Sequence, residues 1–382
     1  MYYHDFKGKR ISALGMGTMR LPVIDGDEAR IDVSAAHEMA RYAHEHGVNY
    51  FDTAWAYHNG HSEEVMGEVL AEFDRDSFYL ADKFPGYDVS NFGKHAEIFS
   101  RQLEKCKVDR FDFYLIHNVC EANIEQYLDE ERYGTVGYFK RQRDAGLIGH
   151  LGFSVHGTFD TFKRFMDAYG DDMEFCQIQL NYEDWKFQDA RAKVEYCDAH
   201  EVPVIVMEPL RGGILCKLSG GHRARLDALH PGLTDAQWAF RWLQGLDSVL
   251  TVLGGMSDME QMVENIETFS APEPLSEEER RVLEGIGDEM AHAKGLPCTA
   301  CRYCTDHCPQ GLDIPYLIYL YNEQLSRESG RFITPMSYRA LDDGKKPDAC
   351  IACGACHDVC PQQLAIPEFL AEFASAMNKK KD

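Results

Sequence analysis

The feature that most constrains this fold is a regular alternation of short apolar runs and amphipathic stretches up to about residue 270. Between the apolar runs, apolar residues recur with helical spacing, as in residues 32–47, 63–73 and 91–108. Strands that alternate with helices pair in parallel, and eight such units close a (β/α)8 barrel. Eight runs have the length and composition of strands: residues 16–21, 48–54, 77–84, 110–118, 150–155, 175–181, 203–210 and 249–255.

An open, doubly wound α/β sheet is the competing architecture. A nucleotide-binding sheet of that kind usually carries a G-x-G-x-x-G turn after its first strand. No such turn follows residues 16–21. We therefore predict the α/β class with a closed TIM barrel.

The alternation stops at residues 270–295, which read SAPEPLSEEERRVLEGIGDEMAHAKG. Pro272 and Pro274 interrupt regular structure, and Ser276 can cap a helix whose first turn is acidic. We predict a bridging helix here and a domain boundary near Gly295. With 382 residues the chain is long enough for two domains. We assign residues 1–294 to the barrel with its bridging helix and residues 295–382 to a second domain.

Charge and hydropathy restrict the partners and the location. The formal net charge of −24 predicts no nucleic acid partner and no anionic membrane partner, because both would repel the chain. No apolar run approaches the roughly 18 residues that span a bilayer. The segment MYYHDFKGKR lacks the apolar core of a signal peptide. We expect a cytoplasmic protein.

Eight of the 13 cysteines lie in the last quarter of the chain and form two copies of one pattern. The second copy begins 52 residues after the first. The sequence CPQGLDIP, which starts at the last cysteine of the first copy, returns as CPQQLAIP at the last cysteine of the second. This echo indicates a duplicated unit. The first copy is Cys298, Cys301, Cys304 and Cys308, and the second is Cys350, Cys353, Cys356 and Cys360.

The spacing C-x2-C-x2-C-x3-C-P is that of bacterial ferredoxins, whose cysteine thiolates hold [4Fe–4S] clusters. Zinc is the alternative, because C-x2-C pairs also form tetrahedral zinc sites. Zinc modules usually present two separated pairs, whereas each run here has a third cysteine and a trailing Cys-Pro. We therefore predict two [4Fe–4S] clusters in a ferredoxin-like domain that is mostly helical, since residues 313–349 between the runs have a helical pattern.

In two-cluster ferredoxins the fourth cysteine of each run serves the other cluster. The same crossing here gives two sets of ligands. One set is Cys298, Cys301, Cys304 and Cys360, and the other is Cys350, Cys353, Cys356 and Cys308.

The remaining cysteines are scattered through apolar or helical surroundings. We expect them to be small buried hydrophobic residues and not a disulfide framework. They are Cys106, Cys120, Cys176, Cys197 and Cys216.

Residues 51–70, FDTAWAYHNGHSEEVMGEVL, resemble the second-strand segment of the aldo-keto reductases. Asp52, Tyr57 and the G-x-S-E-x-x-x-G pattern of residues 60–67 carry the likeness. That family has a lysine at the end of the third barrel strand and a histidine at the end of the fourth, and Lys83 and His117 match them. The resemblance covers residues 8 to 270 and implies that all four side chains lie at the C-terminal mouth of the barrel.

The chemistry that the resemblance implies is carbonyl reduction. Tyr57 would give a proton to the forming alkoxide, although a phenol with an ordinary pKa of about 10 is a weak acid at neutral pH. The Lys83 ammonium would lower the pKa of Tyr57, and Asp52 would hold Lys83 in place and keep it charged. His117 would donate a hydrogen bond to the substrate oxygen.

The resemblance also implies residues that bind a nicotinamide. Ser154 and Gln177 match the pair that holds the nicotinamide amide in the family. Two positions depart from the common pattern. Val155 stands where many members have asparagine, and Met207 stands where many have an aromatic residue under the nicotinamide.

Residues 252–266 resemble the family's phosphate-binding loop and helix after strand eight. Gly255 and Ser257 are the expected phosphate contacts, since backbone amides at a helix start suit phosphate. Gln261 stands where an arginine often binds the 2′-phosphate of NADP, which weakens the usual reason to prefer NADP over NAD. Arg211 is the nearest basic substitute, either as a phosphate ligand or as a solvated arginine.

We predict an oxidoreductase that interconverts a small carbonyl and an alcohol with NADP or NAD. Its two [4Fe–4S] clusters would exchange single electrons with a carrier such as ferredoxin. One alternative is a binding or electron-transfer scaffold whose barrel no longer reduces carbonyls, because Val155, Met207 and Gln261 depart from the family pattern. In another, the clusters only brace the C-terminal domain.

Overall fold

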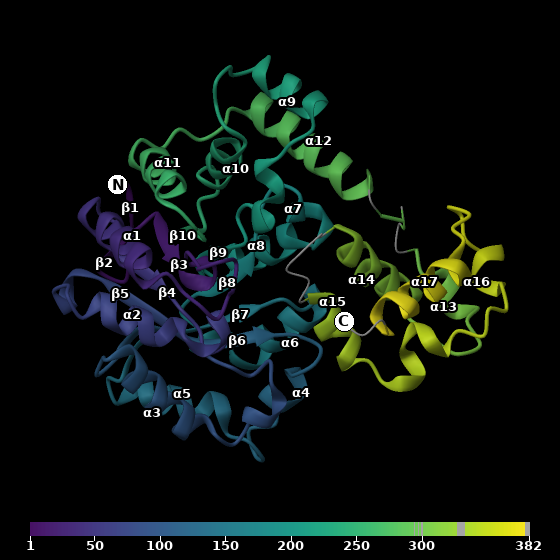
Figure 1. Cartoon of the computed structure of the whole chain (residues 1–382). Coiled ribbons are helices and arrows are strands. Elements are labelled where there is room, and N and C mark those ends of the chain that lie inside the picture. The colour runs from purple at the N-terminus through teal and green to yellow at the C-terminus, as the bar shows by residue number, and fades with distance from the viewer. Residues whose placement is uncertain (294, 297, 299–300, 327–332, 379–382) are drawn as a thin grey trace. The chain divides into compact units, whose positions relative to one another are not determined.

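The structure is a computed structural model, and it describes residues 1–293, 295–296, 298, 301–326 and 333–378 (Figure 1). The chain forms two compact units, Met1–Gly285 and Ile286–Asp382. Among the described residues, no helix is long and apolar enough to cross a membrane.

The first unit contains a closed barrel of eight parallel strands, which confirms the predicted fold class. Its order around the barrel is β10-β3-β4-β5-β6-β7-β8-β9, so neighbours in sequence are neighbours in space and the last strand closes on the first. The strands are β3 (Leu14–Gly17), β4 (Tyr50–Asp52), β5 (Tyr79–Phe84), β6 (Phe111–Val119), β7 (Ile148–Val155), β8 (Cys176–Gln179), β9 (Val204–Met207) and β10 (Val249–Gly254).

The first barrel strand is shorter and earlier than predicted. Thr18–Arg20 forms a 3-10 turn, η1, instead of continuing the strand. The Thr18 hydroxyl donates to the Asp52 carbonyl oxygen at 3.0 Å, which fixes the chain where it turns away from the sheet. The turn places Arg20 on a loop at the mouth.

Helices follow the strands around the outside of the barrel (Figure 1). Helix α12 begins as predicted, because Ser276 and Glu279 form reciprocal hydrogen bonds at its start. The helices that begin in the first unit are α1 (Val33–Glu45), α2 (Ser62–Leu70), α3 (His95–Cys106), α4 (Ile124–Leu128), α5 (Thr135–Asp144), α6 (Phe159–Tyr169), α7 (Asp184–Phe187), α8 (Ala190–Ala199), α9 (Gly220–Asp227), α10 (Asp235–Leu243), α11 (Met259–Ser270) and α12 (Glu277–Ala293).

An antiparallel hairpin that sequence reasoning missed precedes the barrel. It consists of β1 (Tyr3–Phe6) and β2 (Lys9–Ser12). Its buried residues Phe6 and Ile11 belong to the same core cluster as Tyr50 and Phe113 from the barrel strands. The hairpin therefore closes the barrel at the end opposite the predicted mouth, because Tyr50 and Phe113 lie near the starts of their strands.

Burial confirms most of the expectation for the scattered cysteines. Cys106, Cys120, Cys176 and Cys197 are buried. Cys216 is exposed, so the prediction was wrong for this residue: it ends a 3-10 segment (Arg211–Cys216) instead of lying on a buried helix face.

Gly67 of the G-x-S-E-x-x-x-G pattern lies where helices α2 and α3 approach each other. A Cβ atom at this position would lie 2.3 Å from the Lys105 carbonyl oxygen and 2.8 Å from the Cys106 carbonyl carbon. Both are backbone atoms, so a larger residue would force the two helices apart. The pattern thus requires a glycine here for packing.

Gly67→Ala should lower the free energy of unfolding by about 1–3 kcal/mol, the usual cost of overpacking a close contact. Urea unfolding followed by circular dichroism measures it. Gly220→Ala is the matched control, because a Cβ atom at this α9 position meets no atom within 4 Å. We expect that control to be neutral or slightly stabilising. Equal unfolding midpoints for wild type and Gly67→Ala would contradict the packing role.

The second unit is mostly helical, as predicted. Its core repeats the echo in the sequence: Leu312 and Leu364 are both buried, as are Ile314 and Ile366. Equivalent short helices, α13 and α16, each begin after a residue with positive φ, Arg302 at 64° and Gly354 at 80°. The helices are α13 (Tyr303–Asp306), α14 (Ile314–Ser326), α15 (Ile333–Ala340), α16 (Ala355–Asp358) and α17 (Ile366–Asn378).

Candidate active site

The four predicted catalytic residues come from consecutive strands of the barrel. Asp52 is the last residue of β4, and Tyr57 follows it in the 3-10 turn η2 (Tyr57–Gly60). Lys83 lies near the end of β5, and His117 lies near the end of β6. Parallel strands bring these ends to one mouth, so the structure places the four side chains together.

Lys83 is the centre of this group. Its buried Nζ donates to Asp52 Oδ1 at 2.6 Å and to the Thr53 carbonyl oxygen at 2.7 Å. The same Nζ lies 4.9 Å from the centre of the Tyr57 ring. Burial lowers the pKa of Lys83, but Asp52 and Tyr57 raise this pKa by more, so its net shift is upward. Lys83 is therefore a permanent ammonium beside Tyr57.

The pKa of Tyr57 differs from the sequence expectation. Burial raises this pKa, Lys83 lowers it and Asp52 raises it, and the net shift is upward from 10.0. Lys83 thus acts in the expected direction but does not outweigh burial. The physical consequence is that Tyr57 holds its proton at neutral pH and is ready to act as an acid.

His117 is a neutral imidazole. Burial, Lys83 and His156 lower its pKa well below 6.5. Its ring centre lies 6.5 Å from that of Tyr57, with the rings nearly perpendicular. Among the described residues, its Nδ1 has no hydrogen-bond partner. A neutral imidazole can donate one hydrogen bond, and the His117 imidazole lies beside the Tyr57 ring.

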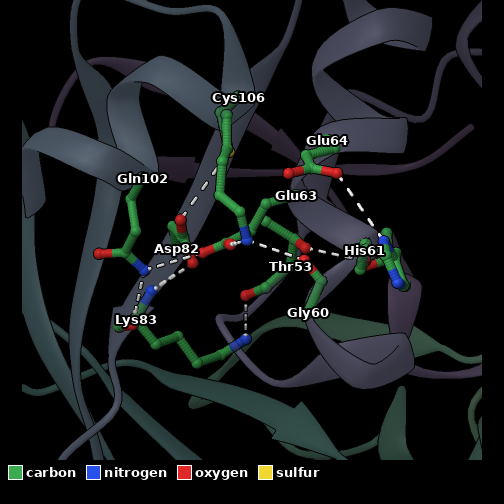
Figure 2. Close-up of polar contacts among 12 residues, drawn as sticks. Thr53, Gly60, His61, Glu63, Glu64, Asp82, Lys83, Gln102 and Cys106 are labelled. Carbon is green, nitrogen blue, oxygen red and sulfur yellow. Dashed lines mark hydrogen bonds and ion pairs between the residues drawn. The ribbon is translucent and has the colours of Figure 1, made fainter. Parts of the chain in front are cut away.

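A buried polar network supports Lys83 from the outer side of the barrel wall (Figure 2). The Asp82 carboxylate accepts the Lys83 backbone N–H at 2.8 Å, and the Gln102 amide donates to the Lys83 carbonyl oxygen at 2.9 Å. Gln102 also donates to Glu63 at 3.1 Å, and Lys105 donates to Glu63 at 2.6 Å. Both peptide groups of Lys83 are thereby fixed.

Two acids in this network lie side by side. Both Asp82 and Glu63 are fully buried, and Glu63 is close enough to act on the charge of Asp82. Burial and the neighbouring Glu63 raise the pKa of Asp82 well above its ordinary value. Sequence reasoning found Glu63 through its pattern but missed Asp82 and Gln102. An acid inside the apolar run LADKF was the available signal for Asp82.

The residues expected to hold a nicotinamide amide are neighbours. Ser154 on β7 and Gln177 on β8 are register partners. The Ser154 hydroxyl oxygen accepts the Asn118 backbone N–H at 2.8 Å, and Gln177 Nε2 donates to Asp52 Oδ2 at 3.2 Å. Met207 ends β9, the next strand after β8 in the barrel.

The predicted phosphate loop follows β10. Asp258 caps helix α11 by accepting the Gln261 backbone N–H at 2.9 Å, and the Gln261 side chain accepts the Ser257 N–H at 3.0 Å. The amides of Ser257 and Gln261 are thus bound within the loop. Gly255 is exposed and precedes them.

Arg211 occupies a different environment from the one expected. Its side chain has no exposed surface. The Nε atom donates to both Asp184 carboxylate oxygens, at 3.0 and 3.2 Å, and Nη1 lies 3.4 Å from Glu183. The residue is therefore neither solvated nor free to face a phosphate. It supports the loops after β8 and β9 instead.

The second unit has two cavities lined by cysteines. Cys298, Cys301, Cys304 and Cys360 line one cavity, together with apolar residues such as Ile318 and Leu364. Cys308, Cys350, Cys353 and Cys356 line the other cavity, together with Leu312 and Leu370. These are the crossed sets that the sequence predicts. Four thiols around an apolar cavity are the donor set of a [4Fe–4S] cluster, so the residues present fit this group.

Backbone amides supplement the cysteines. The Leu312 N–H donates to Cys308 Sγ at 3.5 Å, and the Ala352 N–H donates to Cys350 Sγ at 3.4 Å. Hydrogen bonds to cysteine sulfur are one means by which proteins set cluster potentials.

Comparison with known proteins matches both units. Residues 13–288 match the model of the aldo/keto reductase family, and residues 297–365 match the model of a 4Fe-4S dicluster domain. An uncharacterized oxidoreductase, YqkF, of Bacillus subtilis is 24% identical over 305 residues, which are 72% of this chain and 92% of that protein. L-galactose dehydrogenase of Arabidopsis thaliana is 23% identical over 301 residues, which are 72% of this chain and 90% of that enzyme.

Solved structures show the same barrel. The holo form of aldo-keto reductase AKR11C1 from Bacillus halodurans has a TM-score of 0.61 at 22% identity, covering 75% of this chain and 96% of that one. An aldo-keto reductase from Klebsiella pneumoniae in complex with NADPH has a TM-score of 0.58 at 21% identity, with the same coverage. The family match extends over most of the chain and agrees with the fold. This protein belongs to the aldo/keto reductase family of oxidoreductases and carries a C-terminal 4Fe-4S dicluster domain.

Proposed function

We propose that the barrel interconverts a small carbonyl compound and its alcohol with a nicotinamide dinucleotide as the hydride carrier. The observation that carries this proposal is the group formed by Asp52, Tyr57, Lys83 and His117 at one end of the barrel. A protonated phenol beside a buried ammonium and a neutral imidazole is suited to deliver a proton to an oxygen that becomes negative.

Each of the four residues has a part in this reaction. Tyr57 gives its proton to the carbonyl oxygen, and the Lys83 ammonium stabilises the tyrosinate that remains. Asp52 holds Lys83 in position through the 2.6 Å contact. The neutral imidazole of His117 donates a hydrogen bond that orients the substrate oxygen. In the alcohol-oxidising direction the same proton returns to Tyr57.

A bound nicotinamide dinucleotide would supply the hydride to the carbonyl carbon. Ser154 and Gln177 would hold its amide, Met207 would cover its ring, and the loop at Gly255 and Ser257 would lie near its phosphates. The solved relative from Klebsiella pneumoniae binds NADPH, and a relative from Malus domestica is described as an NADP-dependent dehydrogenase. These relatives support the class of cofactor.

The start of α11 favours NAD over NADP. Gln261 offers no positive charge at the position where the family often has arginine, and the Asp258 carboxylate lies beside it, 2.7 Å from Gln261 Nε2. A carboxylate repels the dianionic 2′-phosphate of NADP and accepts hydrogen bonds from ribose hydroxyls.

Equilibrium titration of the anaerobic, cluster-replete protein with NADH and NADPH tests the cofactor. We expect NADH to bind at least about tenfold more tightly, since a 1.4 kcal/mol difference is tenfold. Asp258→Asn should narrow that gap, because it removes the repelling charge and keeps a polar side chain. Equal or tighter binding of NADPH by the wild type would contradict the preference. Binding of neither would contradict the nicotinamide-dependent reaction and favour the scaffold alternative.

We further propose that the C-terminal unit holds two [4Fe–4S] clusters that exchange single electrons with a partner such as ferredoxin. In each set of four cysteines one residue is exposed, Cys301 in the first and Cys353 in the second. Exposure of a ligand brings the edge of a cluster near solvent, where a carrier can approach. A purely structural cluster has no need of this exposure.

Reduction by a one-electron carrier tests this role. Mixed anaerobically with reduced ferredoxin, the clusters should become paramagnetic and give an electron paramagnetic resonance signal. Clusters that stay oxidised in iron-replete protein, while dithionite also fails to reduce them, would contradict an electron-transfer role and favour bracing of the domain.

A further inference from the structure

Three loops meet at one side of the barrel mouth. Strand β10 pairs with both β3 and β9, so the loops after these three strands are neighbours. The Ser257 hydroxyl, after β10, donates to the Arg20 carbonyl oxygen, after β3, at 3.0 Å. In barrel enzymes the loops after strands seven and eight frequently bind phosphate, and here these are the loops after β9 and β10.

The Arg20 side chain extends across all three loops. A Cβ atom at Gly255 would lie 3.3 Å from Arg20 Cδ, and one at Gly212 would lie 3.1 Å from Arg20 Nη2. Side chains at these two positions would therefore press on the arginine. Because both positions are glycines, no side chain displaces the Arg20 guanidinium, and the backbone on either side of it is not covered by a side chain.

The loop after β9 is built for close approach. Gly212 and Gly213 both have positive φ, at 67° and 88°, a conformation that favours glycine. A Cβ atom at Gly213 would meet no atom within 4 Å, so the space beside it is open. A ligand can thus reach the backbone next to the guanidinium.

The charge of Arg20 is only partly matched. It forms an ion pair with Glu208 in which Arg20 Nη2 and Glu208 Oε1 are 3.4 Å apart, a long contact. The Arg20 side chain is 39% exposed, whereas the Arg211 side chain has no exposed surface and binds two acids. Arginine has five donors in a planar fork that matches the oxygens of phosphate.

We propose that Arg20 binds the diphosphate bridge of the nicotinamide dinucleotide. The inference rests on the proposed function, because it names the residue that recognises the anionic part of that cofactor. Arg20 acts as a binding residue and has no part in proton transfer.

The test is equilibrium titration of the anaerobic holoprotein with NADH and with ADP-ribose, which carries the diphosphate but no nicotinamide. Arg20→Gln should weaken both ligands by about 10- to 100-fold, the range for losing charge-assisted hydrogen bonds. It should also reduce the dependence of affinity on salt. Arg20→Lys should fall between, since lysine keeps the charge and loses the fork. Arg30→Gln is the matched control, because Arg30 is an exposed arginine paired with Asp25 at 3.2 Å.

The outcomes separate this inference from the proposed function. If the wild type binds neither ligand, the proposed function fails and the inference fails with it. If the wild type binds both and Arg20→Gln matches it in affinity and salt dependence, only the Arg20 assignment is overturned. The thermal unfolding midpoint of each variant without ligand shows whether the substitution has lowered the stability of the fold. If Arg20→Gln unfolds early, Arg20→Lys decides: wild-type stability with weakened ADP-ribose binding supports the assignment, and undiminished binding overturns it.

Discussion

Tyr57→Phe should lower the turnover of any carbonyl that the wild type reduces by about 10²–10⁴-fold, the usual contribution of a positioned acid. The ring and its contacts with Lys83 and His117 remain, but the proton for the alkoxide is gone. Nicotinamide binding and iron content should not change, because neither depends on the hydroxyl. Steady-state kinetics with each nicotinamide, paired with a binding titration, measure the effect.

The control for this substitution is Tyr79→Phe, which removes a hydroxyl from the opposite end of β5, the strand that carries Lys83. It should leave turnover near the wild-type level. Lys83→Met should also lower turnover, because the Lys83 ammonium lowers the pKa of Tyr57 and stabilises the tyrosinate. A Tyr57→Phe enzyme that reduces carbonyls at nearly the wild-type rate would end the proposed mechanism.

The direction of the Tyr57 shift also fixes the pH dependence. Burial raises the pKa of Tyr57 above 10.0 despite Lys83, so the acid form persists below pH 10. Carbonyl reduction should therefore show no loss from the titration of Tyr57 below that pH. Alcohol oxidation needs the tyrosinate and should rise towards high pH.

Paired cysteine substitutions should halve the iron content if both cysteines line the same cavity, and should abolish it if they line different cavities. Cys308→Ser with Cys350→Ser removes two ligands from one cavity and should leave about four of about eight iron atoms. Cys308→Ser with Cys298→Ser removes one ligand from each cavity and should leave almost no iron. Iron analysis and the absorbance near 400 nm of anaerobically purified protein measure the difference.

The two double variants carry the same number of substitutions and share Cys308→Ser, so they differ only in ligand set. Ligation of each cluster by its own run predicts the reverse: loss of both clusters from the first pair and survival of one in the second. Cys216→Ser should keep all the iron, because this exposed cysteine lies outside both sets.

The barrel was predictable because its signal is local and repeated. Asp52, Lys83 and His117 lie at or near the ends of three consecutive strands. The order of the runs, together with the resemblance to the aldo-keto reductases, was enough to predict that they meet at one mouth. The cysteine sets were predictable because each run has the spacing of bacterial ferredoxins, in which the fourth cysteine serves the other cluster. Both kinds of pattern depend little on distant contacts.

Other features depend on contacts between distant segments. The fate of Arg211 is decided by Asp184, which lies 27 positions before it and has no local pattern that marks it as a partner. The network behind Lys83 brings together β5, α2 and α3, and only the acid at Asp82 hinted at it. Arg20 looked like part of a strand until the 3-10 turn placed it on a loop. Sequence periodicity cannot report such encounters.

The N-terminal hairpin was missed for a different reason. Its strands are four residues each and its outward positions are charged, so the apolar alternation is weak. The turn between the two strands consists of Lys7 and Gly8, which both have positive φ, at 47° and 81°. Two-residue hairpin turns require this geometry, but a lysine in it is uncommon.

The central claim is that the barrel transfers hydride between a nicotinamide and a carbonyl, with Tyr57 completing the proton balance. The most direct measurement follows the hydride itself. The anaerobic holoprotein is given NADH or NADPH deuterated at the transferring position of C4, with a panel of small aldehydes and ketones, and the products are analysed by mass spectrometry. We predict alcohols with one deuterium on the former carbonyl carbon, formed at a rate that Tyr57→Phe greatly reduces. Cluster-replete protein that binds the nicotinamide but forms no deuterated alcohol from any member of the panel would contradict the account.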